Sequence, residues 1–267
     1  MSKKFRIQIG ATFLYNEAKF RSQIISQAIL GDAIELLGPE TSKWVQVKMW
    51  DGYVGWLSKS TIVQEPAEWE NHEFFAPNQL LSRIYESPDL FSTPIRDITL
   101  GSRLPLLARQ DHWVKILLPT GETGWMENDA FGNYGKPDIE KLIHTSLRFI
   151  GIPYLWGGTT PRGIDCSGFT QLLFRLNGIL LKRDASIQYE QGEKVSDSWE
   201  DWQAGDLVFF SENENNSITH VGIIMGDGDF IHSSTSVKIN SLNSDHEKLY
   251  SKTYHEQFIG VKRIGTF

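Results

Sequence analysis

The chain has 267 residues, which is too long for one small module and suits two or three domains of ~100 to 200 residues each. Its 26 Lys and Arg residues stand against 33 Asp and Glu residues, which gives a formal net charge of −7. The chain therefore lacks the cationic excess that neutralises nucleic-acid phosphates. Because 40% of the residues are hydrophobic, we expect a folded protein that binds a small molecule and no nucleic acid.

The first twenty residues contain no apolar stretch of signal-peptide length and no small-residue cleavage site. No apolar run anywhere approaches the ~18 residues needed to cross a bilayer. We therefore expect a cytoplasmic protein that does not contact a membrane. The single cysteine, Cys166, cannot form an intramolecular disulfide and would stay reduced in that compartment.

The N-terminal half contains an internal repeat, because the segment that starts at Gly31 is echoed by the segment that starts at Gly101. Two tryptophans and two glycines recur after 69 residues: Trp44, Gly52, Gly55 and Trp56 match Trp113, Gly121, Gly124 and Trp125. Within each copy every second residue is apolar in short runs that Gly and Pro turns separate, and this pattern predicts short strands. We predict a small β-barrel over residues 1–64 and another over 76–135, joined by a linker at 65–75, with the four tryptophans in the barrel cores.

From residue 136 onward the sequence contains both helical and strand patterns of apolar residues. Apolar residues at helical spacing predict a helix over 137–151 with Asp138 near its N-terminus, and a second helix from Cys166 to Gly178. Apolar runs at 206–210, 220–225, 229–234 and 258–264 predict strands. Residues 136–267 therefore form an α+β domain.

Cys166 has the features of a nucleophile. It opens the second helix, where unpaired backbone N–H groups and the helix dipole favour a thiolate. A nucleophilic cysteine needs a base, and the histidines in the predicted strands of this domain are His220 and His232. A plain two-residue turn at 226–229 would place the two histidines on opposite faces of the sheet, so we predict an odd-length loop or a bulge there. His220 would then take the thiol proton while His232 holds the other ring nitrogen.

Five short segments resemble the motifs of the NlpC-type cysteine endopeptidases of bacterial cell-wall peptides: YLWGG (154–158), DCSGF (165–169), GDLVFF (205–210), HVGI (220–223) and FIHSS (230–234). The N-terminal barrels resemble the bacterial SH3-like modules that accompany this domain. The resemblance implies an α+β, papain-like peptidase domain after two all-β SH3-like barrels. The two-barrel layout is similar to the subgroup of γ-D-glutamyl-L-diamino-acid endopeptidases, which recycle murein peptides in the cytoplasm.

By this resemblance Cys166 is the nucleophile, His220 the base and His232 its orienting partner, and no metal or cofactor is needed. The backbone N–H of Cys166 and the Tyr154 hydroxyl would hold the oxyanion. Asp165 and Ser167 flank the same site, although Asp165 could equally serve only to cap the helix. We expect Trp156 to be a core aromatic residue.

The subgroup requires a free N-terminal L-Ala, whose charged amine needs carboxylate partners. The resemblance assigns Asp184 to this amine and places Ser186 in the same loop. From the first barrel we predict contributions by Glu17 and Tyr53, with Asp32 or Glu35 as alternatives. The substrate would be a short peptide of the L-Ala-γ-D-Glu-L-Lys or diaminopimelate type, and we expect the protein to be a monomer.

Three other functions stay open at this point. The chain could be a non-catalytic protein that binds wall fragments, or an amidase or acyl transferase of related fold. Metal binding would use the cysteine and the histidines of this domain, but their spacing lacks the short intervals typical of zinc sites. That set comprises Cys166, His220, His232, His246 and His255.

Overall fold

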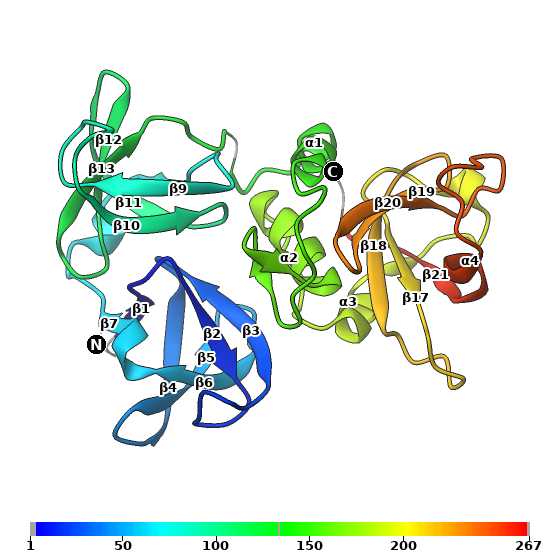
Figure 1. Cartoon of the computed structure of the whole chain (residues 1–267), viewed down its shortest axis with the longest axis horizontal. Coiled ribbons are helices and arrows are strands. Elements are labelled where there is room, and N and C mark those ends of the chain that lie inside the picture. Colours follow the sequence, from blue (N-terminus) through cyan, green and yellow to red (C-terminus); the bar gives the residue numbers. More distant parts are fainter. Residues whose placement is uncertain (1–3, 133, 266–267) are drawn as a thin grey trace. The chain divides into compact units, whose positions relative to one another are not determined.

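The computed structural model describes residues 4–132 and 134–265. They form two compact units that divide between Tyr134 and Gly135, one residue before the domain start predicted from the sequence. The first unit contains both copies of the repeat, and the second contains the α+β region (Figure 1). None of the described helices is long and apolar enough to span a bilayer.

The two copies of the repeat fold in the same way. In the first copy the antiparallel strand order is β3-β2-β6-β5-β4-β1-β7, and in the second it is β10-β9-β13-β12-β11-β8. Each strand of the second order has its counterpart at the same place in the first, which confirms the duplication. The first copy comprises β1 (Phe5–Ile7), β2 (Ala11–Tyr15), β3 (Ile24–Ile29), β4 (Ala33–Glu40), β5 (Trp44–Met49), β6 (Val54–Ser58) and β7 (Ile62–Gln64). The second comprises β8 (Phe74–Phe75), β9 (Leu81–Tyr85), β10 (Pro94–Thr99), β11 (Leu104–Gln110), β12 (Trp113–Leu117) and β13 (Thr123–Glu127).

The prediction that the four repeated tryptophans fill barrel cores is wrong. Trp44 is buried, but it packs against Tyr15 and Phe20 and does not belong to the barrel core. Trp56, Trp113 and Trp125 are partly exposed. Successive side chains of a strand point to opposite faces, and the inward positions belong to neighbours such as Leu57 and Met126. The tryptophans beside these residues therefore cannot all face inward.

The predicted linker at 65–75 has structure of its own. It contains a short 3₁₀ turn, Trp69–Asn71, and strand β8, and Trp69 is fully buried in the core of the second copy. The polar composition of this segment gave no sign that Trp69 would be buried in a core.

The second unit is an antiparallel sheet with helices. Its strand order is β16-β21-β17-β18-β19-β20, and α2 packs against β18 and β19. The helices are α1 (Ile139–Leu147), α2 (Cys166–Leu176), α3 (Ala185–Gln191) and α4 (Lys252–Glu256). The strands are β14 (Thr159–Thr160), β15 (Gly163–Ile164), β16 (Glu193–Lys194), β17 (Leu207–Phe210), β18 (His220–Gly226), β19 (Asp229–Ser233), β20 (Val237–Ser241) and β21 (Phe258–Arg263). The two predicted helices and four predicted strands are confirmed. The elements that were not predicted are α3, α4, β14, β15, β16 and β20.

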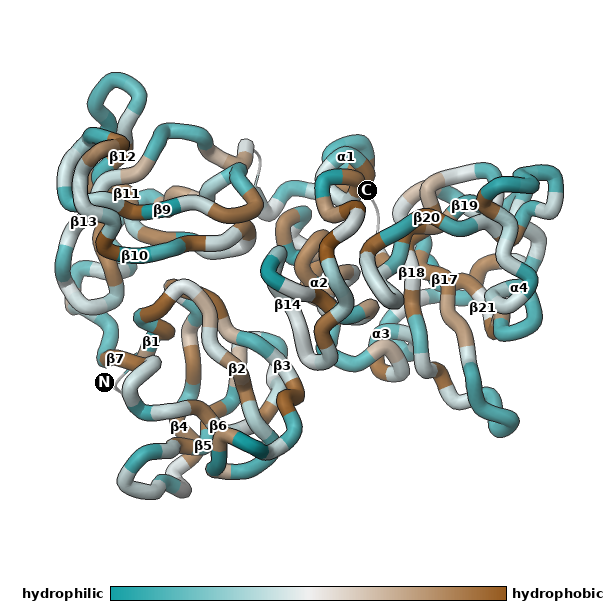
Figure 2. The backbone as a smooth tube through the Cα atoms, viewed as in Figure 1, coloured by the Kyte–Doolittle hydropathy of each residue, from teal (hydrophilic) through white to brown (hydrophobic). Residues whose placement is uncertain are grey.

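Helix α2 is the buried element that carries Cys166. Of its eleven residues only Arg175 is not buried, and Figure 2 shows hydrophobic residues along the helix. The Asp165 side chain caps its N-terminus by accepting the Gly168 N–H at 2.7 Å. A Cβ atom at Gly168 would lie 2.1 Å from the Gly158 carbonyl oxygen, so only glycine lets the helix start approach the preceding loop this closely.

A register shift between β18 and β19 places the two histidines on one face. Ile223 pairs with Ile231 and Ile224 with Phe230, but Gly226 pairs with Asp229. The extra residue is a β-bulge next to a turn in which Asp227 and Gly228 both have positive φ. The predicted bulge is confirmed, and it brings His220 and His232 to the same side of the sheet.

Candidate active site

The Cys166 thiol lies at the start of α2 and is 6% exposed. The backbone N–H groups of Val221 and Ser167 are within hydrogen-bonding reach of the sulfur and favour its anionic form. Val221 directly follows His220 in β18, so the strand that carries the imidazole also contacts the sulfur. The fold thus brings the sulfur to a strand residue, Val221, that lies 55 positions later in the sequence.

A chain of hydrogen bonds determines which nitrogen of His220 carries a proton. The Asn240 side-chain amide donates to the Leu249 carbonyl at 3.2 Å, which directs its oxygen toward Nε2 of His232 at 3.0 Å. His232 Nε2 is therefore the protonated nitrogen, and its Nδ1 accepts from His220 Nε2 at 2.7 Å. His220 Nδ1 consequently keeps its lone pair, which is the form that a general base requires.

Burial disfavours the charged form of both Cys166 and His220. It raises the pKa of the Cys166 thiol to about 12, and the nearby Asp165 carboxylate adds to this rise. It lowers the pKa of His220 well below its usual 6.5, and His232 and Lys238 lower it further. Burial therefore opposes the thiolate that the helix start and the two N–H groups favour.

His232 is fully buried and is neutral. Burial lowers its pKa to about 4, although the hydrogen bond to Asn240 acts in the opposite direction. A neutral His232 can accept the hydrogen bond from His220, whereas a doubly protonated ring could not. The same burial therefore supports the orienting role predicted for this residue.

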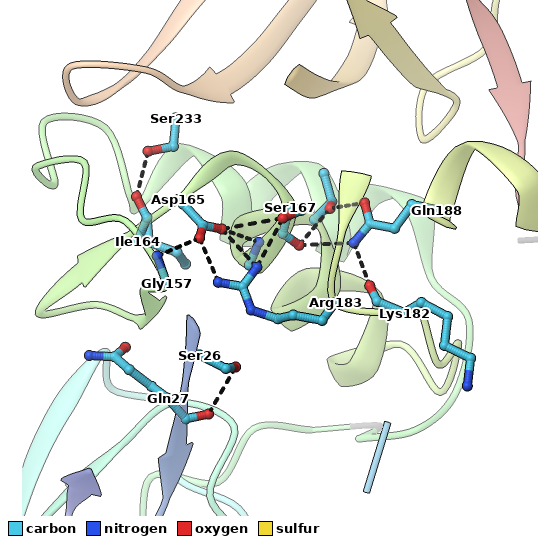
Figure 3. Close-up of polar contacts among 12 residues, drawn as sticks. Ser26, Gln27, Gly157, Ile164, Asp165, Ser167, Lys182, Arg183, Gln188 and Ser233 are labelled. Carbon is cyan, nitrogen blue, oxygen red and sulfur yellow. Dashed lines mark hydrogen bonds and ion pairs between the residues drawn. The ribbon is translucent and has the colours of Figure 1, made fainter. Parts of the chain in front are cut away.

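Asp165 is held in a buried ion pair with Arg183 (Figure 3). The two guanidinium nitrogens donate to the two carboxylate oxygens at 3.0 and 2.5 Å, and the Gly157 N–H donates at 2.9 Å. Together with the helix cap, these bonds use both carboxylate oxygens. The geometry favours the capping alternative over substrate binding for Asp165, and it ties the residue before Cys166 to a separate segment of the chain.

Two further predicted residues flank the thiol. Tyr154 is half-buried, and its pKa is raised by burial first and then by the charges of Cys166 and Asp165. Its hydroxyl is therefore protonated and able to donate a hydrogen bond to an oxyanion. Ser167 is buried, and its hydroxyl accepts from Arg183 at 2.9 Å. Trp156, expected in the core, is instead 61% exposed, because it lies in the loop before β14 rather than in a strand or helix.

The residues predicted for the substrate amine lie on α3. Asp184 is the N-cap residue of this helix and is partly buried, and Ser186 is exposed in its first turn. Gln188 anchors the helix to α2: it accepts from the Thr170 hydroxyl at 2.7 Å and donates to the Ser167 carbonyl at 3.0 Å (Figure 3). Asp184 thus follows Arg183, which belongs to the Asp165 ion pair.

The first-barrel candidates belong to the other unit. Glu17 is exposed and pairs with Lys19 at 2.5 Å, while Tyr53 packs against the core of the first copy. Of the alternatives, Asp32 is buried and accepts the Ile29 N–H, and Glu35 is exposed and pairs with Lys48. Contributions of these residues to substrate binding stay predictions.

The sequence reading missed Asn240 and Arg183. A hydrophilic residue in a short strand and an arginine in a loop carry no local signal of their partners. Among residues 4–132 and 134–265, no group of three His, Cys, Asp or Glu side chains is arranged to hold a metal ion. His246, one member of the metal-binding alternative, pairs with Asp229 at 2.8 Å.

Three family models match successive parts of the chain. The NlpC/P60 family model matches residues 151–263, a bacterial dipeptidyl-peptidase SH3 domain model matches 14–62 and a bacterial SH3 domain model matches 80–131. The γ-D-glutamyl-L-lysine dipeptidyl-peptidase of Bacillus cereus is 31% identical over 262 residues, which cover 91% of this chain and 75% of that protein. Its namesake in Bacillus subtilis is 31% identical over 239 residues, which cover 86% of this chain and 78% of that protein.

A solved structure has the same architecture. The crystal structure of an NlpC/P60 family protein from Bacillus cereus matches with a TM-score of 0.83 and 26% identity, and the match covers 97% of this chain and 99% of that one. The chain therefore belongs to the NlpC/P60 family, as a cysteine peptidase whose mixed α+β domain follows two bacterial SH3 domains.

Proposed function

We propose that this protein hydrolyses the bond between γ-D-Glu and L-Lys, or diaminopimelate, in cell-wall peptides that carry a free N-terminal L-Ala. The observation that supports it most is the Asn240–His232–His220 hydrogen-bond chain, which supplies an unprotonated base on the strand that contacts the only thiol. The printed names of the two Bacillus relatives support the γ-D-glutamyl-L-lysine bond. We extend the proposal to murein peptide recycling in the cytoplasm, as the resemblance to the two-barrel subgroup implies, and to a monomeric enzyme.

In the proposed reaction, Cys166 and His220 start as a neutral pair, the form that burial favours. The thiol proton passes to His220 Nδ1 as the sulfur attacks the γ-carbonyl carbon of D-Glu, and an S–C bond forms. The imidazolium then gives this proton to the departing amine of the third residue as the C–N bond breaks. Water, deprotonated by the same imidazole, hydrolyses the resulting thioester and releases L-Ala-D-Glu. The N–H of Cys166 and the hydroxyl of Tyr154 would stabilise the oxyanion in both steps.

The substrate amine is proposed to bind Asp184. A protonated amine and a carboxylate form a charge-assisted hydrogen bond, and Asp184 follows the Arg183 that is fixed by Asp165. A substrate with a blocked amine would lose this contact. This would restrict the enzyme to fragments that have a free N-terminus.

The test is to incubate the purified protein with L-Ala-γ-D-Glu-L-Lys, with the diaminopimelate analogue, with the N-acetylated tripeptide and with an α-linked isomer. We expect L-Ala-D-Glu to be released from free-amine γ-linked peptides only, and Cys166→Ala to abolish the release. Cleavage of the acetylated peptide would refute the amine requirement. Peptide binding without any product from the parent protein would instead favour a protein that only binds wall fragments.

A further inference from the structure

Tyr254 packs on both histidines of the site from the C-terminal segment of the chain. Its ring is stacked on the His220 imidazole, with centroids 5.6 Å apart and an interplanar angle of 23°. It meets His232 edge to face at 4.7 Å and 86°. Tyr254 lies on α4, whose first turn is capped by the Ser251 hydroxyl. No motif quoted from the sequence includes this residue.

The ring completes an aromatic enclosure around the two imidazoles. On the protein side, the fully buried Phe210 lies 5.9 Å from His220, and the fully buried Phe230 lies 4.9 Å from His232. Tyr254 also contacts both of these phenylalanines, at 5.0 and 5.6 Å. An imidazole held between aromatic faces cannot rotate about χ2 without displacing them.

The orientation of His220 is what the hydrogen-bond chain requires. If the ring turned over about χ2, Cε1 would replace Nε2 toward His232 and Cδ2 would take the place of Nδ1, so His220 would lose its hydrogen bond to His232 and would no longer present its lone pair in the same position. The Tyr254 hydroxyl forms a hydrogen bond with the Ser234 side chain, two residues beyond His232. This bond anchors the tyrosine ring to the strand end next to which it packs.

We propose that Tyr254 is a positioning residue of this site: its ring holds the His220 imidazole in the orientation that keeps Nδ1 free for the thiol proton, and it excludes water from the His220–His232 hydrogen bond. Only the expected loss of kcat rests on the proposed function. The effect of Tyr254 on the orientation and pKa of His220 is independent of any substrate.

The charged and titratable groups around His220 come from four elements. His232 on β19 and Lys238 on β20 act on His220, Tyr254 on α4 packs on its ring, and Cys166 on α2 and Glu212 act on Tyr254. Burial is the largest cause of the low pKa of His220. Removal of the covering ring should therefore admit water and move this pKa upward, toward 6.5.

The experiment compares Tyr254→Leu, Tyr254→Met and Tyr254→Phe with the parent in the full-length chain. Two quantities are measured: kcat and KM on L-Ala-γ-D-Glu-L-Lys, and the pKa of His220 by NMR titration of its ring. Tyr250→Leu is the matched control, because Tyr250 lies in the same segment and its ring contacts His255 rather than the site. Circular dichroism confirms the fold of each variant.

We expect Tyr254→Leu and Tyr254→Met to lower kcat by roughly 10- to 100-fold, as misplacement of a reacting group does, and to raise the His220 pKa. KM should change by less than about 2-fold, because the ring acts on the base and not on substrate binding. Tyr250→Leu should resemble the parent, and Tyr254→Phe, which keeps the ring but loses the bond to Ser234, should lose much less of kcat than Tyr254→Leu. Methionine fills space with a flexible chain, so it provides a second test if the leucine variant does not fold.

Unchanged kcat and unchanged His220 pKa in the leucine or methionine variant would overturn the inference. A loss in Tyr254→Phe as large as that in Tyr254→Leu would also overturn it, because the hydroxyl and not the ring would then act. If the parent releases no product from the peptide, the proposed function fails. The NMR titration still decides the role of Tyr254 in that case.

Discussion

Removal of the Arg183 guanidinium should destabilise the start of the catalytic helix. In Arg183→Met the buried Asp165 carboxylate loses two charge-assisted bonds, at 3.0 and 2.5 Å, from a pair whose side chains are only 2% and 9% exposed. Breaking such a pair by removing one partner costs about 3–5 kcal/mol. Asp165 keeps the N–H groups of Gly157 and Gly168, so we expect the lower end, about 3 kcal/mol.

The single cysteine provides a local assay for this effect. Cys166 is the only cysteine in the chain and it is buried directly after Asp165, so a thiol reagent labels it fastest when this region opens. A loss of about 3 kcal/mol corresponds to a roughly 100-fold rise in the open population and in the labelling rate. The control is Lys194→Met, which removes an exposed ion pair with Asp197 and should cost less than about 1 kcal/mol.

A double variant shows whether the buried charge is the cause. In Asp165→Asn combined with Arg183→Met the charge disappears with its partner, and asparagine can still cap the helix. We expect this protein to be labelled more slowly than Arg183→Met alone. The reasoning about an uncompensated buried charge is refuted if the double variant is labelled as fast as the separate effects of Asp165→Asn and Arg183→Met predict when they are added. It is also refuted if Arg183→Met is labelled no faster than Lys194→Met.

Two further predictions concern the histidine chain. Asn240→Leu removes the acceptor that fixes the His232 tautomer. We therefore expect kcat at pH 7 to fall by ~10-fold or more, which is less than the ~10⁴-fold loss known for a wrong catalytic tautomer. An unchanged kcat would show that the tautomer is set without Asn240. Because the pKa of His232 is about 4 in the fold and about 6.5 in the unfolded chain, the unfolded chain binds more protons and stability is lost as pH falls from 6.5 toward 4. This loss approaches about 3 kcal/mol, and urea unfolding at pH 7 and pH 4 should show a smaller difference for His232→Gln than for the parent; equal differences would contradict the shift.

Local patterns in the sequence predicted much of the fold. The 69-residue repeat, the two amphipathic helices with their Asp138 and Asp165 caps, and the apolar strands of the second unit all depend on residues close together in the chain. The bulge between β18 and β19 was predictable for the same reason, since it follows from strand parity and two glycines. Cys166, His220 and His232 were singled out because a helix start and two strand histidines are each visible locally.

Tertiary structure alone decided how those residues are used. The pKa shifts of Cys166 and His220 depend on burial, which sums the packing of many distant side chains, and so the sequence could indicate a nucleophile but not that burial opposes its ionisation. Asn240, Arg183 and Tyr254 act through partners 8, 18 and 34 positions away, across strands and loops whose lengths no local pattern specifies. A residue whose role consists of a contact cannot be recognised until the chain has brought its partner to it.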